Sequence, residues 1–315
     1  MERRKVICVV GPTACGKTTL GVLLAQKYGG EVVSADSMQI YRGMTIVTAA
    51  PTEAEMQGVP HHMIAVADPA EQWSAAEYVQ RATPVVDDIL ARGRLPVIVG
   101  GTGLWMDALL RGHGFAKGSA GGAVRRELET RFEQEGIEPL LAELRQVDPD
   151  SAVRLHPADT KRILRALEVY RETGQTITAH NAATQAMPDR YSAVKIGLRF
   201  ADREDMKALI DRRVDKMAAE GLLTEVRALL DQGLPKNATA MQAIGYKEFL
   251  GVLDGTLTEP EALELVKLRS RQYAKRQLTW LRRDQDIHWI EWGKQRDFAR
   301  ALQISTEILA ASGLG

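Results

Sequence analysis

The sequence is poor in several kinds of residue, and each shortage excludes a class of protein. Two cysteines in 315 residues, Cys8 and Cys15, are too few for a disulfide framework, and no histidine stands near them at metal spacing. No apolar run reaches the roughly 18 residues of a membrane span, and the run after the charged N-terminus covers only residues 6–10. Lys plus Arg equals Asp plus Glu at 41 each, so any nucleic-acid partner must be sought in local basic segments. We therefore expect a reduced, cytoplasmic protein.

The composition and the pattern of apolar runs favour a globular α/β fold. Hydrophobic residues make up 45% and charged residues 26%, which allows a substantial core. Residues 6–10 and 96–100 are short continuous apolar runs, and both predict buried parallel strands, with a further strand at 31–35. A helical pattern over 18–28 separates the first two strands along the chain. Strands alternating with helices predict a parallel sheet with helices on both faces.

A glycine-rich segment divides the chain. Residues 112–122 contain five glycines and few apolar residues, which is typical of a loop or linker. Residues 123–183 then show helical periodicity, an alternating strand pattern returns at 194–200, and helices follow over 203–283 with breaks at 233–235 and 254–255. The predicted domains are a catalytic core of residues 1–115 and 192–315 and a helical insertion of residues 116–191.

A phosphate-binding loop follows the first predicted strand. The sequence Gly-Pro-Thr-Ala-Cys-Gly-Lys-Thr at 11–18 fits G-x-x-x-x-G-K-[ST], and a chance glycine turn is disfavoured by the strand before it and the helix after it. Its backbone N–H groups and the helix N-terminus would bind a diphosphate or triphosphate, Lys17 supplies a cation, and the Thr18 hydroxyl can ligate Mg²⁺. The predicted diphosphate-binding residues are Gly11, Pro12, Thr13, Ala14, Cys15, Gly16, Lys17 and Thr18.

The acids around this loop argue against phosphoryl transfer. A nucleotide-hydrolysing P-loop protein usually ends a neighbouring strand with a metal-binding acid, but the strand at 96–100 runs into Gly-Thr-Gly at 101–103. Asp36 instead follows the strand at 31–35, at the sheet edge where ligands bind. Three interpretations of Asp36 remain open here: metal ligand, general base, or helix N-cap.

Six blocks of sequence together resemble the tRNA dimethylallyltransferases, also called tRNA isopentenyltransferases. The P-loop alone is shared by many proteins, whereas the whole set in this order is specific. The blocks are 11–18, 36–44 (Asp-Ser-Met-Gln-Ile-Tyr-Arg-Gly-Met), 100–104 (Gly-Gly-Thr-Gly-Leu), 159–170 (Asp-Thr-Lys-Arg-Ile-Leu-Arg-Ala-Leu-Glu-Val-Tyr), 243–246 (Ala-Ile-Gly-Tyr) and 273–282 (Tyr-Ala-Lys-Arg-Gln-Leu-Thr-Trp-Leu-Arg).

The resemblance implies a reaction and a set of site residues. A dimethylallyl group would leave dimethylallyl diphosphate and join N6 of the adenosine beside the anticodon in the tRNA anticodon stem-loop, with Mg²⁺ at Thr18 and the protein a monomer. The implied catalytic residues are Asp36, as the base for the N6 proton, with Lys17, Thr18 and Arg213. The implied tRNA-binding residues are Asp36, Ser37, Met38, Gln39, Thr102, Arg125, Lys161, Arg162, Arg165, Gln242, Gly245, Tyr246, Lys247, Lys275, Arg276, Gln277, Trp280 and Arg282.

The basic segments are consistent with an RNA partner. Residues 267–283 hold seven cations and no acid, with Tyr273 and Trp280 among them. The aromatic side chains would either stack on bases or pack inward, and the charges would either bind RNA or form a solvated helix face.

Four positions depart from the family pattern. Val47 stands where similar proteins have glycine, and Ala50, Ala65 and Leu209 stand where they have Lys, Asp and Arg. A β-branched Val47 would fit badly if that backbone had positive φ. The departures predict slow catalysis or weak binding that restored polar groups would improve. Three alternatives therefore stay open: a tRNA-binding protein with weakened or lost catalysis, a P-loop small-molecule kinase, and a prenyltransferase acting on free adenine nucleotides.

Overall fold

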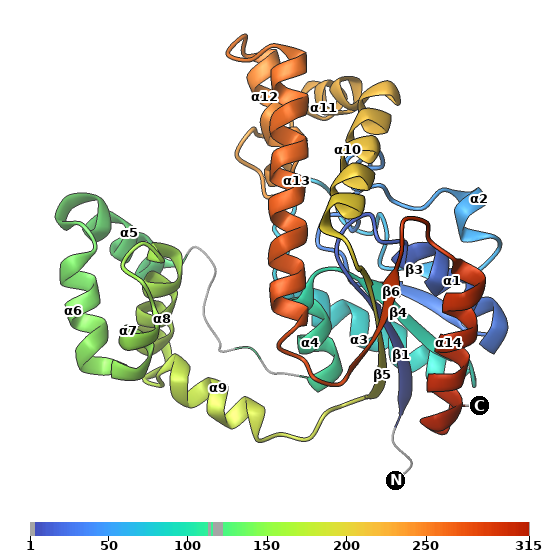
Figure 1. The fold of residues 1–315 in the computed structure, drawn as a ribbon. Coiled ribbons are helices and arrows are strands. Elements are labelled where there is room, and N and C mark those ends of the chain that lie inside the picture. Colours follow the sequence, from blue (N-terminus) through green and yellow to red (C-terminus); the bar gives the residue numbers. More distant parts are fainter. Residues whose placement is uncertain (1–3, 113–114, 116–121, 315) are drawn as a thin grey trace. The chain divides into compact units, whose positions relative to one another are not determined.

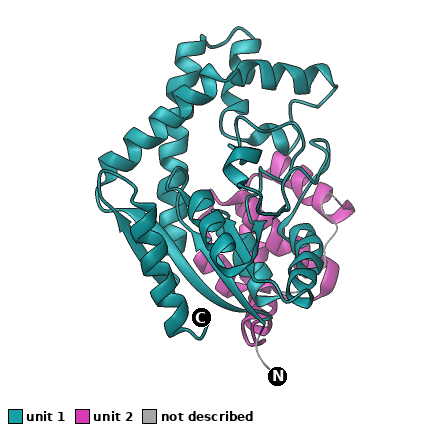
Figure 2. Cartoon of the chain, turned by 90° about the vertical axis from the view of Figure 1, so that its right-hand side faces the viewer, with its two compact units in different colours: residues 1–112, 190–315 teal, residues 113–189 magenta. Residues whose placement is uncertain are grey.

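The computed structural model describes residues 4–112, 115 and 122–314. Its contacts divide the chain into two compact units, one of residues 1–112 with 190–315 and one of residues 113–189, which Figure 2 shows in different colours. Within the described residues, no helix combines the length and apolar character needed to span a membrane.

The larger unit is built on a six-stranded sheet in the order β3-β2-β4-β1-β5-β6, in which every pair of neighbours is parallel. This confirms the predicted α/β fold with a P-loop sheet flanked by helices. The two outer strands were not predicted, because β3 has only two residues and the buried and exposed residues of β6 do not alternate regularly. The strands are β1 (Lys5–Val10), β2 (Glu31–Ser34), β3 (His61–His62), β4 (Pro96–Gly100), β5 (Ser192–Phe200) and β6 (Ile287–Trp292).

Helices cover both faces of this sheet. Along β1, Val6, Cys8 and Val10 belong to one hydrophobic cluster, and Ile7 and Val9 belong to another. The first cluster includes side chains of α3 and α4, and the second includes side chains of α1 and α14 (Figure 1). β1 is therefore buried on both faces, as its continuous apolar run predicts. The helices are α1 (Lys17–Tyr28), α2 (Glu53–Met56), α3 (Ala75–Ala91), α4 (Gly103–Arg111) and α14 (Phe298–Ala311).

The helical segment between β5 and β6 has more breaks than the sequence predicted. Gly221 has φ of 98°, a left-handed conformation that ends α10 and starts α11. Turns and one short 3₁₀ helix then separate α11 from α12. The long helix α13 packs against α10 and α12 (Figure 1). The elements are α10 (Arg203–Ala219), α11 (Leu222–Asp231), η1 (Ala240–Gln242), α12 (Tyr246–Leu253) and α13 (Glu259–Leu281).

The smaller unit is helical, with a hydrophobic core of its own. Leu128, Leu140, Leu144, Ile163 and Leu167 are fully buried in one cluster. Leu140 and Leu144 are four residues apart, as are Ile163 and Leu167, which places each pair on one face of its helix. The helices are α5 (Ala123–Glu135), α6 (Glu138–Val147), α7 (Pro149–Arg154), α8 (Thr160–Thr173) and α9 (Ile177–Gln185).

Candidate diphosphate-binding active site

The phosphate loop leaves the carboxyl end of β1 and enters α1. Gly11 has φ of 150° and would bring a Cβ within 2.5 Å of the Leu198 carbonyl oxygen, so a side chain does not fit there. Gly16, with φ of 91°, gives the loop its left-handed turn into the helix. Lys17 donates to the Pro12 carbonyl at 2.8 Å across the loop. The loop thus has the ring conformation in which N–H groups and the helix N-terminus bind phosphate.

Two distant side chains fix Thr13 within this loop. The Thr13 amide donates to Gln277 Oε1 at 2.9 Å, and the other end of Gln277 donates to the Gly101 carbonyl at 3.0 Å. Arg213 donates to Thr13 Oγ1 at 2.9 Å and, at 3.4 Å, to the Thr48 carbonyl. Arg213, predicted to assist the leaving diphosphate, therefore reaches the phosphate loop directly. Gln277, predicted to touch tRNA, is instead buried between two loops of the site.

Cys15 contributes its backbone, not its thiol, to the loop. Its side chain is fully buried, and its carbonyl accepts a hydrogen bond from the Trp292 indole at 2.8 Å. Burial raises the pKa of the Cys15 thiol, which keeps the sulfur protonated and unreactive.

Asp36 begins a turn at the carboxyl end of β2. Its Oδ1 accepts from the Met38 amide at 2.9 Å, and the Ser37 amide donates to Thr102 Oγ1 at 3.2 Å. Residues 37–40 form turns and no helix, so the helix N-cap interpretation of Asp36 is wrong. General base and metal ligand remain, and three predicted tRNA-binding residues, Ser37, Met38 and Thr102, gather around this carboxylate.

The negative charge of Asp36 affects the pKa of both Arg213 and Tyr273. Burial lowers the pKa of the Arg213 guanidinium, and the negative charge of Asp36 opposes that shift. Burial raises the pKa of Tyr273 to about 12, and Asp36 adds to the rise, while the hydroxyl lies beside Thr102 and Gln277. An acid, a cation and a phosphate loop thus meet where β1, β2 and β4 end, the edge at which α/β sheets bind ligands.

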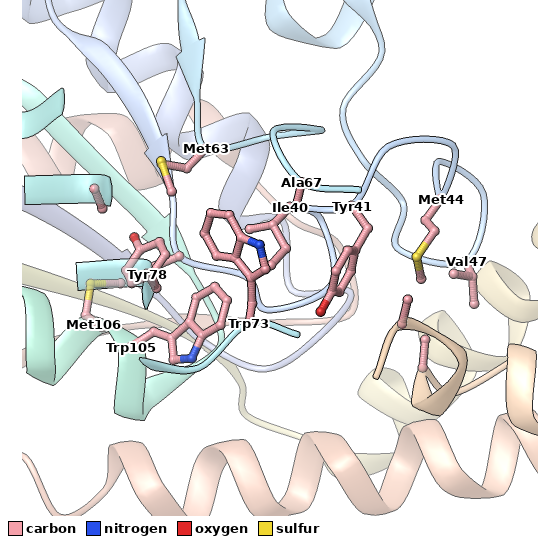
Figure 3. Close-up of a cluster of buried hydrophobic side chains, with 14 of the residues drawn as sticks. Ile40, Tyr41, Met44, Val47, Met63, Ala67, Trp73, Tyr78, Trp105 and Met106 are labelled. Carbon is pink, nitrogen blue, oxygen red and sulfur yellow. The ribbon is translucent and has the colours of Figure 1, made fainter. Parts of the chain in front are cut away.

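The segment after Asp36 is packed into an apolar cluster. Figure 3 shows Ile40, Tyr41, Met44 and Val47 from this segment in that cluster of buried side chains. Farther along the same cluster, the Tyr78 and Trp105 rings stack with centroids 4.4 Å apart. This packing gives the Asp36 turn a rigid support, because close-packed side chains move little.

Glu225 on α11 organises the next part of this segment, residues 45–47. Its carboxylate accepts from the amides of Thr45 at 2.8 Å, Ile46 at 2.7 Å and Val47 at 3.1 Å. The Tyr246 hydroxyl also donates to it, at 2.6 Å. Because the next residue, Thr48, offers its carbonyl to Arg213, Glu225 positions the loop beside the guanidinium. Nothing in the local sequence marks Glu225, since its amide partners lie about 180 residues away.

Changing Glu225 to Gln should lower the free energy of unfolding by about 2–3 kcal/mol, because three amides and two hydroxyls, those of Thr45 and Tyr246, lose a charged acceptor. Urea denaturation measures this change. Glu220→Gln is the matched control, since Glu220 is exposed and pairs with Lys216 at 3.5 Å, and should change stability by less than about 0.5 kcal/mol. Equal effects of the two substitutions would show that the carboxylate of Glu225 does not organise the loop.

Val47 does not carry the strain that the sequence suggested. The non-glycine residues with positive φ between positions 45 and 65 are Ala49 at 44°, Gln57 at 50°, Met63 at 60° and Ala65 at 51°, and Val47 is not among them. The Val47 side chain is buried and fills the space over Gly245, where a Cβ would lie 2.5 Å from Val47 Cγ2. The expected misfit of a β-branched residue is therefore wrong, and Val47→Gly would remove a core contact.

The predicted tRNA-binding residues of the C-terminal part differ in how far their side chains are exposed to solvent. Lys275, Arg276, Trp280 and Arg282 are exposed at or near the end of α13, and Gln242 and Lys247 are exposed around the start of α12. Tyr246 is instead fully buried, with its hydroxyl on Glu225, and Gly245 is buried with φ of 113°. Their side-chain positions do not offer a surface to RNA, because both face the loop over residues 45–47.

Trp280 is held in place at the surface. Its side chain is 40% exposed, its indole donates to Asp107 Oδ2 at 3.2 Å, and it covers Gly103, which has no Cβ to displace it. Arg283 lies over the ring, 5.8 Å from its centroid. Of the two aromatic residues of this segment, Tyr273 thus faces the site interior and Trp280 offers a ring to solvent.

In the insertion, the predicted tRNA contacts lie on α5 and α8. Lys161 and Arg162 are exposed on the first turn of α8. Arg165 pairs with the buried Glu168 at 3.0 Å, and Arg125 lies 3.9 Å from the same carboxylate. Glu168 therefore fixes two of the predicted cations relative to each other within this unit.

Comparison with known proteins identifies the family. Residues 39–284 match the family model described as IPP transferase. The chain is 45% identical to the tRNA dimethylallyltransferase of Geobacillus thermodenitrificans over 295 residues, covering 94% of this chain and 93% of that protein. It is 48% identical to the tRNA dimethylallyltransferase of Symbiobacterium thermophilum over 286 residues, covering 91% and 89%. The chain belongs to the IPP transferase family.

Solved structures agree with this IPP transferase assignment. The tRNA isopentenylpyrophosphate transferase of Bacillus halodurans superposes with a TM-score of 0.73 at 40% identity, covering 98% of this chain and 96% of that one. A eukaryotic dimethylallyltransferase acting on tRNA superposes with a TM-score of 0.82 at 29% identity, covering 98% and 80%. The predicted family resemblance is thereby confirmed. Within this IPP transferase, the phosphate loop at 11–18 and the residues after 284 lie outside the matched family region.

Proposed function

We propose that this chain transfers the dimethylallyl group of dimethylallyl diphosphate to N6 of the adenosine beside the anticodon of tRNA, acting as a monomer in the cytoplasm. The observation that carries the proposal is that a phosphate loop, the Arg213 side chain bonded to that loop, and the carboxylate of Asp36 lie together at one edge of the sheet. All of these groups belong to one compact unit, so one chain suffices for the chemistry.

In the proposed reaction, the C1–O bond of the donor breaks as a bond forms between C1 and the adenine N6. Negative charge then builds on the diphosphate, and the loop N–H groups, Lys17 and Arg213 stabilise it. Asp36 accepts the proton that leaves N6, which helps because an exocyclic amine is a weak nucleophile. The adenosine must leave its stack in the anticodon loop to reach this edge of the sheet.

Mg²⁺ fits the same site through Thr18. The Thr18 hydroxyl lies in the first turn of α1 next to Lys17, and Mg²⁺ prefers oxygen ligands from a hydroxyl, phosphates and water. When bound, the ion would neutralise charge on the departing diphosphate.

Incubation with unmodified tRNA, dimethylallyl diphosphate and Mg²⁺, followed by digestion and mass spectrometry, should yield prenylated adenosine. Lys17→Ala should weaken donor binding and transfer while tRNA affinity changes little, because Lys17 faces the phosphate loop. Unmodified adenosine, together with thermal protection by ATP and none by dimethylallyl diphosphate, would favour a kinase instead.

A further inference from the structure

The chain passes between the larger and the smaller unit twice, and both passages start from one place in the larger unit. The chain leaves that unit after Gly112 and returns to it at Arg190. The Leu110 carbonyl accepts from the amides of Arg190 at 3.0 Å and Tyr191 at 3.1 Å. Gly112, with φ of 67°, lies against Arg190, since an added Cβ would be 3.0 Å from Arg190 Cβ. The outgoing and returning segments therefore lie side by side within the larger unit.

Asp87 on α3 holds the returning segment. Its Oδ2 accepts from the Arg190 guanidinium at 2.6 Å, and its Oδ1 accepts from the Tyr191 hydroxyl at 2.7 Å. Arg4, the residue before β1, donates to the same Oδ1 at 2.8 Å, and the Arg4 carbonyl accepts from the Ser192 amide at 2.9 Å. We call Asp87, Arg4, Arg190 and Tyr191 the Asp87 cluster. One carboxylate in it ties the returning segment to a helix and to the start of the central strand.

The side chains of the Asp87 cluster also support one another. The Arg190 guanidinium lies 5.6 Å from the centroid of the Tyr191 ring and donates to the Tyr191 hydroxyl at 3.2 Å. Burial raises the pKa of Tyr191 to about 12, so its hydroxyl stays protonated and can donate. Burial opposes ionisation of Asp87, but hydrogen bonds from Tyr191 and Arg190 outweigh it and lower the pKa of Asp87. An ionised carboxylate that accepts from three donors is a strong anchor.

The Asp87 cluster lies far from the reacting groups. Arg4 and Ser192 stand at the amino ends of β1 and β5, whereas the phosphate loop leaves the carboxyl end of β1. β1 has six residues, so roughly 20 Å of strand separates the two places. Asp87 can therefore influence the reaction only through Arg190 and Tyr191 and the segment that they carry.

That segment carries the insertion, which has exposed cations of its own, Lys161 and Arg162 on the first turn of α8. A binding surface on a separate unit loses less freedom on binding when its attachment to the main unit is already fixed. We propose that Asp87 is a positioning residue for tRNA, which acts through Arg190 and Tyr191 to fix the place where the insertion is attached. The choice of tRNA as the ligand rests on the proposed function.

Steady-state kinetics of the full chain with unmodified tRNA and dimethylallyl diphosphate test this role. Asp87→Asn should raise the KM for tRNA about five- to tenfold, because Asn loses the charge and one of the two acceptor oxygens. The kcat and the KM for dimethylallyl diphosphate should stay within about twofold, since the phosphate loop lies at the other end of β1.

Asp88→Asn is the matched control. Asp88 is the next residue of α3, is exposed, and pairs with Arg92 of the same helix at 2.9 Å. Both substitutions remove one negative charge, and charge alone would make RNA binding tighter. Asp88→Asn should therefore leave the KM for tRNA unchanged or slightly lower. A KM that is likewise unchanged or lower in Asp87→Asn overturns the proposal.

Tyr191→Phe keeps the ring and removes only the hydroxyl on Asp87. It should raise the KM for tRNA about threefold, and combining it with Asp87→Asn should add less than about twofold to the effect of Asp87→Asn, because the two side chains act as one unit. If kcat in Tyr191→Phe falls in step with the melting temperature while the KM for tRNA stays constant, the cluster only stabilises the fold and the proposal fails.

Amide hydrogen exchange gives a readout that needs no activity. The amides of Arg190 and Tyr191 should exchange about tenfold faster in Asp87→Asn than in Asp88→Asn, because their segment opens more often from the Leu110 carbonyl. Equal exchange overturns the role of Asp87 even if the native chain prenylates tRNA. Faster exchange together with weaker tRNA binding in a fluorescence titration supports it even where no prenylated adenosine forms, an outcome that contradicts the proposed function alone.

Discussion

Replacing Asp36 by Asn should lower the single-turnover rate of prenyl transfer by about 10²–10⁴-fold, while donor and tRNA affinities stay within about twofold. Asn keeps an oxygen that can accept from the Met38 amide, so the turn at residues 36–38 is preserved. It cannot take the N6 proton, and it removes the negative charge that acts on Arg213 and Tyr273. Rapid-quench measurement with saturating enzyme isolates this chemical step.

Asp68→Asn is the matched control. Asp68 accepts from the Ala70 amide at 2.9 Å, the same contact two residues ahead that Asp36 makes, but on the exposed side of the loop before α3. The single-turnover rate of prenyl transfer by the Asp68→Asn variant should match that of the unsubstituted chain. If Asp36→Asn keeps a third or more of the rate, Asp36 forms the turn and another group takes the proton.

The parts predicted well were those encoded by contiguous residues. The phosphate loop is eight consecutive residues between a strand and a helix, and the central strands are unbroken apolar runs. The parts predicted badly depend on contacts across long stretches of chain. Gln277 meets Thr13 across 264 residues, and Glu225 meets the amides at 45–47 across about 180. No local pattern encodes such pairings.

Helical spacing explains the inward position of Gln277 and the ion pairs between α13 and α10. Ala274, Gln277 and Leu281 share one face of α13, and all three are buried. Gln277 therefore faces inward with its apolar neighbours, which the spacing already indicated. Likewise Lys267 and Arg271 are four residues apart on α13, and Asp211 and Asp215 are four apart on α10, so they form two matched pairs.

These pairs change the interpretation of the basic segment. Lys267 bonds Asp215 at 2.8 Å and Arg271 bonds Asp211 at 2.6 Å, so both cations join α13 to α10. The segment at 267–283 thus contains a part that stabilises the fold and an exposed part near the end of α13. We expect the exposed cations Lys275, Arg276 and Arg282 to meet RNA phosphates.

Changing Lys275, Arg276 and Arg282 together to Ala should weaken tRNA binding about 10–100-fold and make the log–log salt slope less negative by about 2–3, since each lost phosphate contact releases fewer counterions. Diphosphate affinity should not change, because these three side chains are exposed, whereas Gln277, which contacts the phosphate loop, is buried. Fluorescence titration of labelled tRNA at several salt concentrations measures both quantities.

The matched control is Lys267→Ala/Arg271→Ala, which removes cations from the same helix. Because these side chains are paired with acids of α10, their loss should lower thermal stability, and the salt slope should change by less than about 1. An unchanged slope in the triple variant would place the RNA phosphates away from the end of α13. A slope that changes equally in both variants would mean that the ion pairs with α10 open when tRNA binds, so that Lys267 and Arg271 exchange a carboxylate for a phosphate.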